Sequence, residues 1–213
     1  MSLLRRLSVI APALLVLTGC SLLGKREDLT VYAPAWVHPS DAQAAHRARE
    51  WQLGIVEPRA IGPLDGSRIA VMPSAGQIET YKGARWRDSA PVLIQQLLLQ
   101  AFQDSAGLAG VGAPTSVLHA DFSLQSDLQD FQAEYRGARL PTVVIRLSGQ
   151  LVDNSSGRIL ASRIFTVEQL CAGSGMPEVF SAFQVALNQV LPQVVEWATA
   201  TGDASWDRRT PAR

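Results

Sequence analysis

Hydrophobic and polar residues alternate in several stretches of the chain, and this alternation predicts strands. The short strands expected from it are Leu29–Pro34, Trp51–Glu57 and Arg68–Pro73, each ending at or beside a proline. Longer strands are expected over residues 119–135, 143–151 and 159–167. The parity of the apolar positions changes after Leu128, which predicts a β-bulge near Gln129–Asp130. Asp153–Gly157 has the composition of a hairpin loop. Four residues are expected on the inward face of the last strand: Ile159, Ala161, Phe165 and Val167.

Two other stretches have the period of an amphipathic helix. The first is expected to begin after Asp88 or Ser89, with Pro91 in its first turn, and to end near Asp104, before Gly107. The second is expected to begin near Pro177 and to be kinked by Pro192. Residues 74–87 and 108–116 are predicted as loops. The order of elements favours an α+β fold, a mostly antiparallel sheet with two main helices packed on one face.

The N-terminal residues have the features of a lipoprotein signal peptide. Arg5 and Arg6 precede Leu7–Leu17, an uncharged apolar stretch too short to cross a bilayer as a helix. Leu17-Thr18-Gly19-Cys20 then resembles a lipobox, which predicts cleavage between Gly19 and Cys20 and attachment of diacylglycerol and a fatty acyl chain such as palmitate to Cys20. The alternative is an ordinary secretory signal with an incidental cysteine. Ser21 stands where an aspartate would retain the protein in the inner membrane of enteric bacteria, so analogy favours the outer membrane.

The 213-residue chain is expected to have four regions. We expect a signal peptide (1–19), a lipidated tether (20–30), one periplasmic domain (31–200) and a flexible polar tail (201–213). The precursor has 19 basic and 19 acidic residues, and loss of the two signal arginines leaves 17 against 19, a net charge of −2. Without a basic excess, a nucleic-acid partner is not expected. Cys171 becomes the single thiol, and the three histidines lack the spacing of metal ligands.

Several motifs in the mature chain resemble the ABC-type transport auxiliary lipoprotein family, the periplasmic lipoprotein component of Mce-type lipid transport systems. The strongest stretch is Tyr81-Lys-Gly-Ala-Arg85-Trp86-Arg-Asp88-Ser-Ala-Pro91, followed by Leu93-Ile-Gln95-Gln-Leu97. The other matching stretches are Val31-Tyr32-Ala-Pro34, Trp51-Gln-Leu53, Arg68-Ile-Ala-Val71, Ala120-Asp-Phe122, Leu128-Gln-Asp-Phe131 and Ala182-Phe183-Gln-Val-Ala-Leu187.

The resemblance implies a role that is not enzymatic. In such systems an inner-membrane ATPase and permease supply the power and an Mce-domain protein forms a hydrophobic conduit, whose outer end the lipoprotein would attach to the outer membrane. The resemblance supplies no catalytic residue and no cofactor, so the only attached group expected is the lipid on Cys20. A subunit that serves a ring-shaped conduit could itself form a homo-oligomer. Two alternatives remain, a free-standing lipid-binding lipoprotein and a scaffold for envelope assembly.

Five residues are candidates for contact with a partner: Tyr81, Arg85, Trp86, Phe131 and Tyr135. Trp86 and Arg85 have the residue types of interface hot spots, but large aromatic side chains are usually buried, which favours the alternative that Trp86 lies under the start of the helix while Arg85 pairs with a carboxylate. Phe131 and Tyr135 follow the expected bulge and could contact lipid or a subunit, or form a small buried cluster. Cys171 with His119 could suggest a thiol nucleophile, but no local motif supports catalysis and an inert buried cysteine is the more common case.

Overall fold

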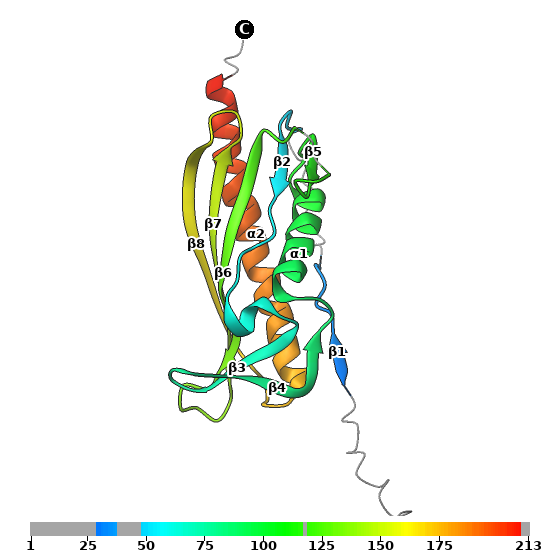
Figure 1. Cartoon of the computed structure of the whole chain (residues 1–213), viewed down its shortest axis with the longest axis vertical. Helices are drawn as coiled ribbons and strands as arrows, with labels where there is room; N and C mark the ends of the chain where they lie inside the picture. Colours follow the sequence, from blue (N-terminus) through cyan, green and yellow to red (C-terminus); the bar gives the residue numbers. More distant parts are fainter. Residues whose placement is uncertain (1–28, 38–47, 117–118, 210–213) are drawn as a thin grey trace, which may run out of the picture.

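Three long antiparallel strands and one long helix form the frame of the molecule. The computed structural model describes residues 29–37, 48–116 and 119–209. The strands are β6 (Phe122–Glu134), β7 (Thr142–Asp153) and β8 (Arg158–Leu170), and the helix is α2 (Met176–Arg209). β7 lies between β6 and β8, and α2 runs along one face of all three (Figure 1).

Five shorter strands extend the sheet beyond the other edge of β6. They are β1 (Thr30–Tyr32), β2 (Gln52–Ile55), β3 (Arg68–Ser74), β4 (Gln77–Trp86) and β5 (Gly110–Gly112). β2 pairs in parallel with the first residues of β6 and β3 pairs in parallel with its last residues, so the two strands share one edge of β6. β4 continues the sheet antiparallel to β3, and β1 and β5 pair in parallel with β4 and β2. The expected α+β class is confirmed. The sheet is mostly antiparallel, and its parallel pairs all involve the short strands β1, β2, β3 and β5.

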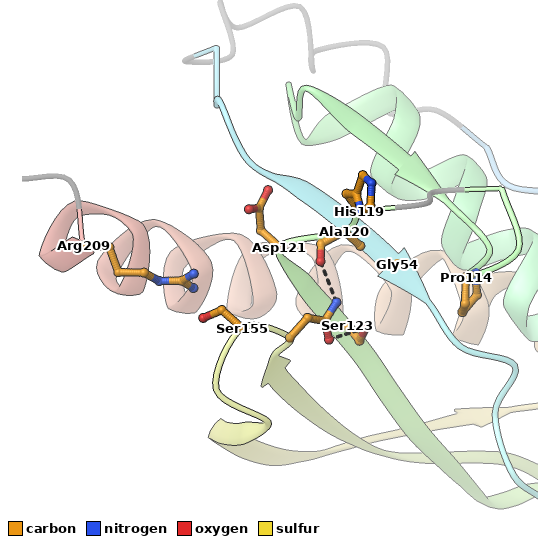
Figure 2. A pocket seen from close by; sticks show the side chains of 9 residues that line it. Gly54, Pro114, His119, Ala120, Asp121, Ser123, Ser155 and Arg209 are labelled. Atoms are coloured by element: carbon orange, nitrogen blue, oxygen red, sulfur yellow. Dashed lines mark hydrogen bonds between the residues drawn. The ribbon is translucent and has the colours of Figure 1, made fainter.

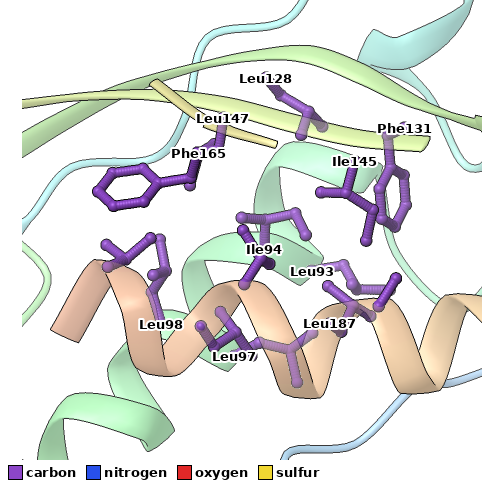
Figure 3. Close-up of a cluster of buried hydrophobic side chains, with 14 of the residues drawn as sticks. Leu93, Ile94, Leu97, Leu98, Leu128, Phe131, Ile145, Leu147, Phe165 and Leu187 are labelled. Carbon is purple, nitrogen blue, oxygen red and sulfur yellow. The ribbon is translucent and has the colours of Figure 1, made fainter. Parts of the chain in front are cut away.

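Both helices cover the same face of this sheet. α1 (Ala90–Ser105) begins one residue after Ser89, carries Pro91 in its first turn, and is followed by Gly107 with a positive φ of 58°. A short 3₁₀ helix, η1 (Gly62–Asp65), precedes β3. The apolar positions of α1 and α2 meet the inward side chains of β6, β7 and β8, and Figure 3 shows these side chains filling the space between helices and sheet.

The predicted bulge in β6 is present, and a second bulge alters β8. The register between β6 and β7 shifts between Leu128 and Asp130, as the change of parity indicates. A further shift places Leu151 opposite Ala161 but Val152 opposite Ile159. Leu160 is therefore an extra residue, and Ile159 turns to the solvent side with 55% of its surface exposed. The expectation that Ile159 faces inward is wrong for this reason.

Two predicted loops contain strands. Residues 77–86 form β4, which pairs with β3 on one side and with β1 on the other, so the expectation of a loop over 74–87 is wrong. The connector over 108–116 contains the three-residue strand β5, held by β2. Both strands form because they pair with distant segments of the chain. Neither has an alternating sequence that would predict it.

The C-terminal residues are also more ordered than the sequence indicates. α2 continues through Pro192 and Thr201 to Arg209, so residues 201–209 are helical and not a flexible tail. Gly202 and Ser205 are buried in this last part, which shows that it packs on the domain. Among the described residues, no helix is both long enough and apolar enough to cross a bilayer.

Candidate functional site

Two of the residues predicted to contact a partner lie in the core. Trp86 and Phe131 are 0% and 1% exposed, and their ring centroids lie 5.3 Å apart. Phe183 of α2 completes the cluster, 5.0 Å from each of the other two rings. Three aromatic rings packed in this way join β4, β6 and α2, and they are not available to a partner while the domain is folded. The alternative in which Trp86 is buried rather than exposed is therefore the one that agrees with the structure.

The other three predicted residues are partly accessible. Tyr81 of β4 and Tyr135, which follows β6, pack against the edge of the core near the buried Cys171. Burial and the neighbouring Tyr135 raise the pKa of Tyr81, and within the described residues its hydroxyl makes no hydrogen bond of good geometry. Arg85 donates a long hydrogen bond of 3.5 Å to the Trp86 carbonyl, and no ion pair of Arg85 occurs in the described part of the chain.

The predicted lipid-modification site cannot be placed in this fold. Cys20 and the cleavage position at Gly19 lie outside the described residues. The pair of residues that could suggest a thiol nucleophile is not assembled. His119 precedes β6, whereas Cys171 follows β8, and the register places these two positions at opposite ends of the long strands. Burial raises the pKa of the Cys171 thiol, which favours its unreactive protonated form.

A polar hollow of about 490 Å³ opens at the end of the sheet where β6 begins (Figure 2). Its polar groups mostly bind one another. Asn154 donates a hydrogen bond of 2.7 Å to the Ala120 carbonyl and accepts one of 2.9 Å from the Ser123 hydroxyl, and the Asp121 carboxylate accepts one of 2.8 Å from the backbone N–H of Gln52. The remaining lining residues are Gly54, Pro114, His119, Ser155 and Arg209.

Arg209, the cation of this hollow, is held by the protein itself. Its guanidinium lies 3.3 Å from the Asp153 carboxylate and 4.6 Å from the centre of the Phe122 ring. Burial disfavours the charged form of Asp153, but hydrogen bonds from Ser155 and the attraction of Arg209 prevail and lower its pKa. The hollow thus contains a satisfied network that fixes the end of α2, rather than free groups positioned for a ligand.

A second hollow, of about 590 Å³, lies at the other end of the sheet and is lined mainly by apolar surface. It opens between the β3–β4 turn and the loop that joins β6 to β7. Its lining residues are Met72, Pro73, Ser74, Ala75, Gly76, Glu134, Arg136 and Gly137. Gly76 and Gly137 have positive φ values of 77° and 79°, so each turn depends on glycine at its tightest point.

Arg136 and Glu134 form the charged part of the lining of this hollow. Its guanidinium donates to Glu134 at 2.7 Å and to both carboxylate oxygens of Glu168 at 2.9 Å. The Arg136 guanidinium therefore lowers the pKa of Glu168. None of these residues is among the candidates predicted from the sequence. The glycines at 76 and 137 were the available signal for two turns, but nothing in the sequence indicates that the turns lie side by side.

The fold and the order of its elements agree with a known family. The family model for the ABC-type transport auxiliary lipoprotein component matches residues 37–195, which is most of the chain. The chain belongs to this family. Membership implies a location in the Gram-negative cell envelope, and the family is described as the auxiliary lipoprotein component of ABC-type transport.

Solved and curated proteins resemble the chain to different degrees. The crystal structure of protein XCC0632 from Xanthomonas campestris is 33% identical, with a TM-score of 0.76 over 84% of this chain and 99% of that one. The crystal structure of an uncharacterized protein has a TM-score of 0.62 and 16% identity over 80% of this chain and 98% of that one, which shows a shared fold. The uncharacterized protein bll6063 of Bradyrhizobium diazoefficiens is 27% identical over 160 residues, 75% of this chain. The chain spans only 42% of the length of that relative.

Proposed function

We propose that the protein is the docking subunit of an Mce-type ABC lipid transport system, anchored in the outer membrane on its periplasmic side. The observation that carries the proposal is the family match over residues 37–195, in a chain whose first residues end in a lipobox. An auxiliary component that is lipidated at Cys20 would keep the outer end of a lipid conduit close to the outer membrane.

The anchor determines where the domain works. Two or three acyl chains on Cys20 would make release from the membrane negligible, because each buried methylene contributes about 0.8 kcal/mol. Ser21 supports placement in the outer membrane, by analogy with the sorting signal of enteric lipoproteins. The tether between Cys20 and β1 is too short to let the domain reach across the periplasm.

The proposed partner is the periplasmic Mce-domain protein of the transporter. The role is binding rather than catalysis, without a cofactor beyond the covalent lipid. The accessible residues among the sequence-based candidates are Tyr81 and Arg85, on β4, and Tyr135, just after β6; both of these strands pair with β3. A homo-oligomer is part of this proposal, since several copies could surround one ring-shaped conduit.

Comparison of the native chain with Cys20→Ser tests the proposal in the producing cell. The native protein is expected in the outer-membrane fraction, and mild detergent is expected to extract it together with an Mce-domain protein. Cys20→Ser should leave the membrane fraction while the domain stays folded. Repeated recovery of the native protein without an Mce-domain protein, even after crosslinking, would overturn the docking role.

The apolar hollow of about 590 Å³ favours one second candidate, a free-standing lipid-binding lipoprotein. Its volume falls in the range of about 300–1,000 Å³ that is usual for small-molecule sites. This candidate predicts that the purified protein retains phospholipid and has no Mce partner. Extraction of the purified protein with organic solvent, followed by mass spectrometry of the extract, distinguishes it from the docking subunit.

A further inference from the structure

One end of the domain gathers the start of β1, the β3–β4 turn, the β6–β7 loop and the end of β8. The register requires most of this arrangement, because Met72 pairs with Glu134, Glu134 with Thr142, and Thr142 with Leu170. In Figure 1 these segments and the start of β1 lie at the lower end of the molecule, with β1 beside the last residues of β4 and the β3–β4 turn on the opposite side. We call this the tether end, since the chain between Cys20 and the domain joins it at β1.

The tether end carries large apolar side chains that do not contribute to the core. They are Leu29 (56% exposed), Val31 (46%), Ile78 (42%), Leu140 (36%) and Leu170 (62%). They come from separate segments of the chain, so a single irregular loop does not account for them. Isolated exposed leucines are common, but exposed apolar residues on each of several neighbouring segments are typical of a surface that meets an apolar phase.

The length of the tether indicates which apolar phase this is. Eight residues lie between Cys20 and Leu29, which makes nine steps from one Cα atom to the next, and at about 3.6 Å per step the tether covers at most about 32 Å. A flexible chain of this length has a root-mean-square span of roughly 15–18 Å. The start of β1 is therefore held close to the bilayer that contains the acyl chains, and the neighbouring turns are held there with it.

We propose that the tether end rests on the phospholipid bilayer, with Ile78 and Leu140 entering its interfacial layer. The inference rests on the proposed lipidation of Cys20 and adds a second, non-covalent contact that fixes the orientation of the domain. Arg139, beside Leu140, is exposed, so its guanidinium is accessible to lipid phosphate groups. In this orientation the long strands and α2 point away from the membrane, toward the periplasm.

Labels at single cysteines test the orientation in the full, lipidated chain. Spin labels are placed at Ile78→Cys and Leu140→Cys, and the matched control is Ile159→Cys, which is similarly exposed but lies near the β7–β8 turn at the opposite end. The protein is reconstituted by its own anchor into vesicles of phosphatidylethanolamine and phosphatidylglycerol. Cys171 is buried, and the protein without an added cysteine measures its background labelling. Mass spectrometry of the N-terminal peptide first establishes that Cys20 is acylated, so a failure of anchoring is distinguished from a failure of orientation.

We expect that binding to vesicles lowers the collision rate of the labels at 78 and 140 with a water-soluble relaxation agent by at least about two-fold, relative to the protein without vesicles. Their collision rate with oxygen should rise. The label at 159 should have the same collision rate with the water-soluble agent whether or not the protein is bound to vesicles. Equal water accessibility at all three positions in acylated protein would overturn the proposal. Protection at 78 and 140 that appears only after an Mce-domain protein is added would also overturn it, because the tether end would then be a protein interface.

Discussion

The indole Nε1 of Trp51 donates a hydrogen bond of 2.9 Å to the carboxylate of Asp203. Trp51 stands just before β2 and Asp203 lies in the last part of α2, so the bond joins segments that are 152 residues apart. The same carboxylate accepts two bonds from Arg49 Nε, of 2.9 and 3.0 Å. This network holds the end of α2 against the sheet and explains why the polar C-terminal residues are helical.

Removal of the Asp203 carboxylate should destabilise the domain. Asp203→Ala would leave the Trp51 indole and the Arg49 guanidinium without their acceptor, and hydrogen bonds to charged groups contribute about 1.5–3 kcal/mol each. We expect the free energy of unfolding to fall by about 2 kcal/mol, measured by urea denaturation. Glu196→Ala, at an exposed position of the same helix, is the control and should change it by less than about 0.5 kcal/mol. Equal effects of the two substitutions would contradict the role of Asp203.

Gly202 should not tolerate alanine, although alanine is the better helix former. A Cβ atom at this position would lie 2.7 Å from the Trp51 ring, closer than atoms can approach. Overpacking of this kind costs about 1–3 kcal/mol, more than the roughly 1 kcal/mol that helix propensity would add. Thermal unfolding should show a lower midpoint for Gly202→Ala. The exposed Ala204→Gly reports the effect of propensity alone, and a rise in the midpoint of Gly202→Ala would disprove the close contact.

Asp153 should make stability depend on pH. Its pKa in the folded protein lies below the ordinary value of 3.8, so its contribution is complete above about pH 4 and is lost as the pH falls through the folded-state value. Asp153→Asn should therefore be less stable than the native chain at pH 7, and the difference should shrink as the pH falls below about 4. Denaturant titrations at several pH values measure this. A difference that stays constant over this range would show that the carboxylate charge does not matter.

Trp86 should affect stability rather than partner binding alone. Trp86→Ala removes a fully buried ring from contact with Phe131 and Phe183 and should cost about 3–5 kcal/mol of unfolding free energy. Trp86→Phe, which keeps part of the packing, should cost less and provides a folded variant if the alanine variant is too unstable. A variant with native stability but impaired binding would instead support the exposed-anchor hypothesis for Trp86.

The elements that could be predicted from the sequence are those with a strong pattern of their own. The period of Leu93, Leu97 and Ala101 is enough to predict α1, and the change of parity after Leu128 is enough to predict the bulge in β6. These features depend on side chains that face one continuous core. Local sequence therefore contains the information that specifies them.

The elements that the sequence pattern does not predict form through contacts with distant segments of the chain. β4 has polar residues on both faces and a glycine, Gly83, with a positive φ of 67°, so its sequence does not alternate as a strand should. The polar sequence of residues 201–209 predicts a flexible tail, because the close contact of Gly202 with Trp51 can be seen only in the folded structure. For the same reason the sequence could select Trp86 and Phe131 as aromatic candidates but could not show that both rings face inward.

The central claim is that this lipoprotein docks on an Mce-type transporter, and direct binding tests it best. The full lipidated chain and the Mce-domain protein of the same organism, each purified in mild detergent, are titrated together and their association is measured by light scattering. The docking role predicts saturable binding with a Kd in the micromolar range or tighter, which corresponds to about −8 kcal/mol or more. Folded, acylated protein that shows no saturable binding at tens of micromolar would contradict it.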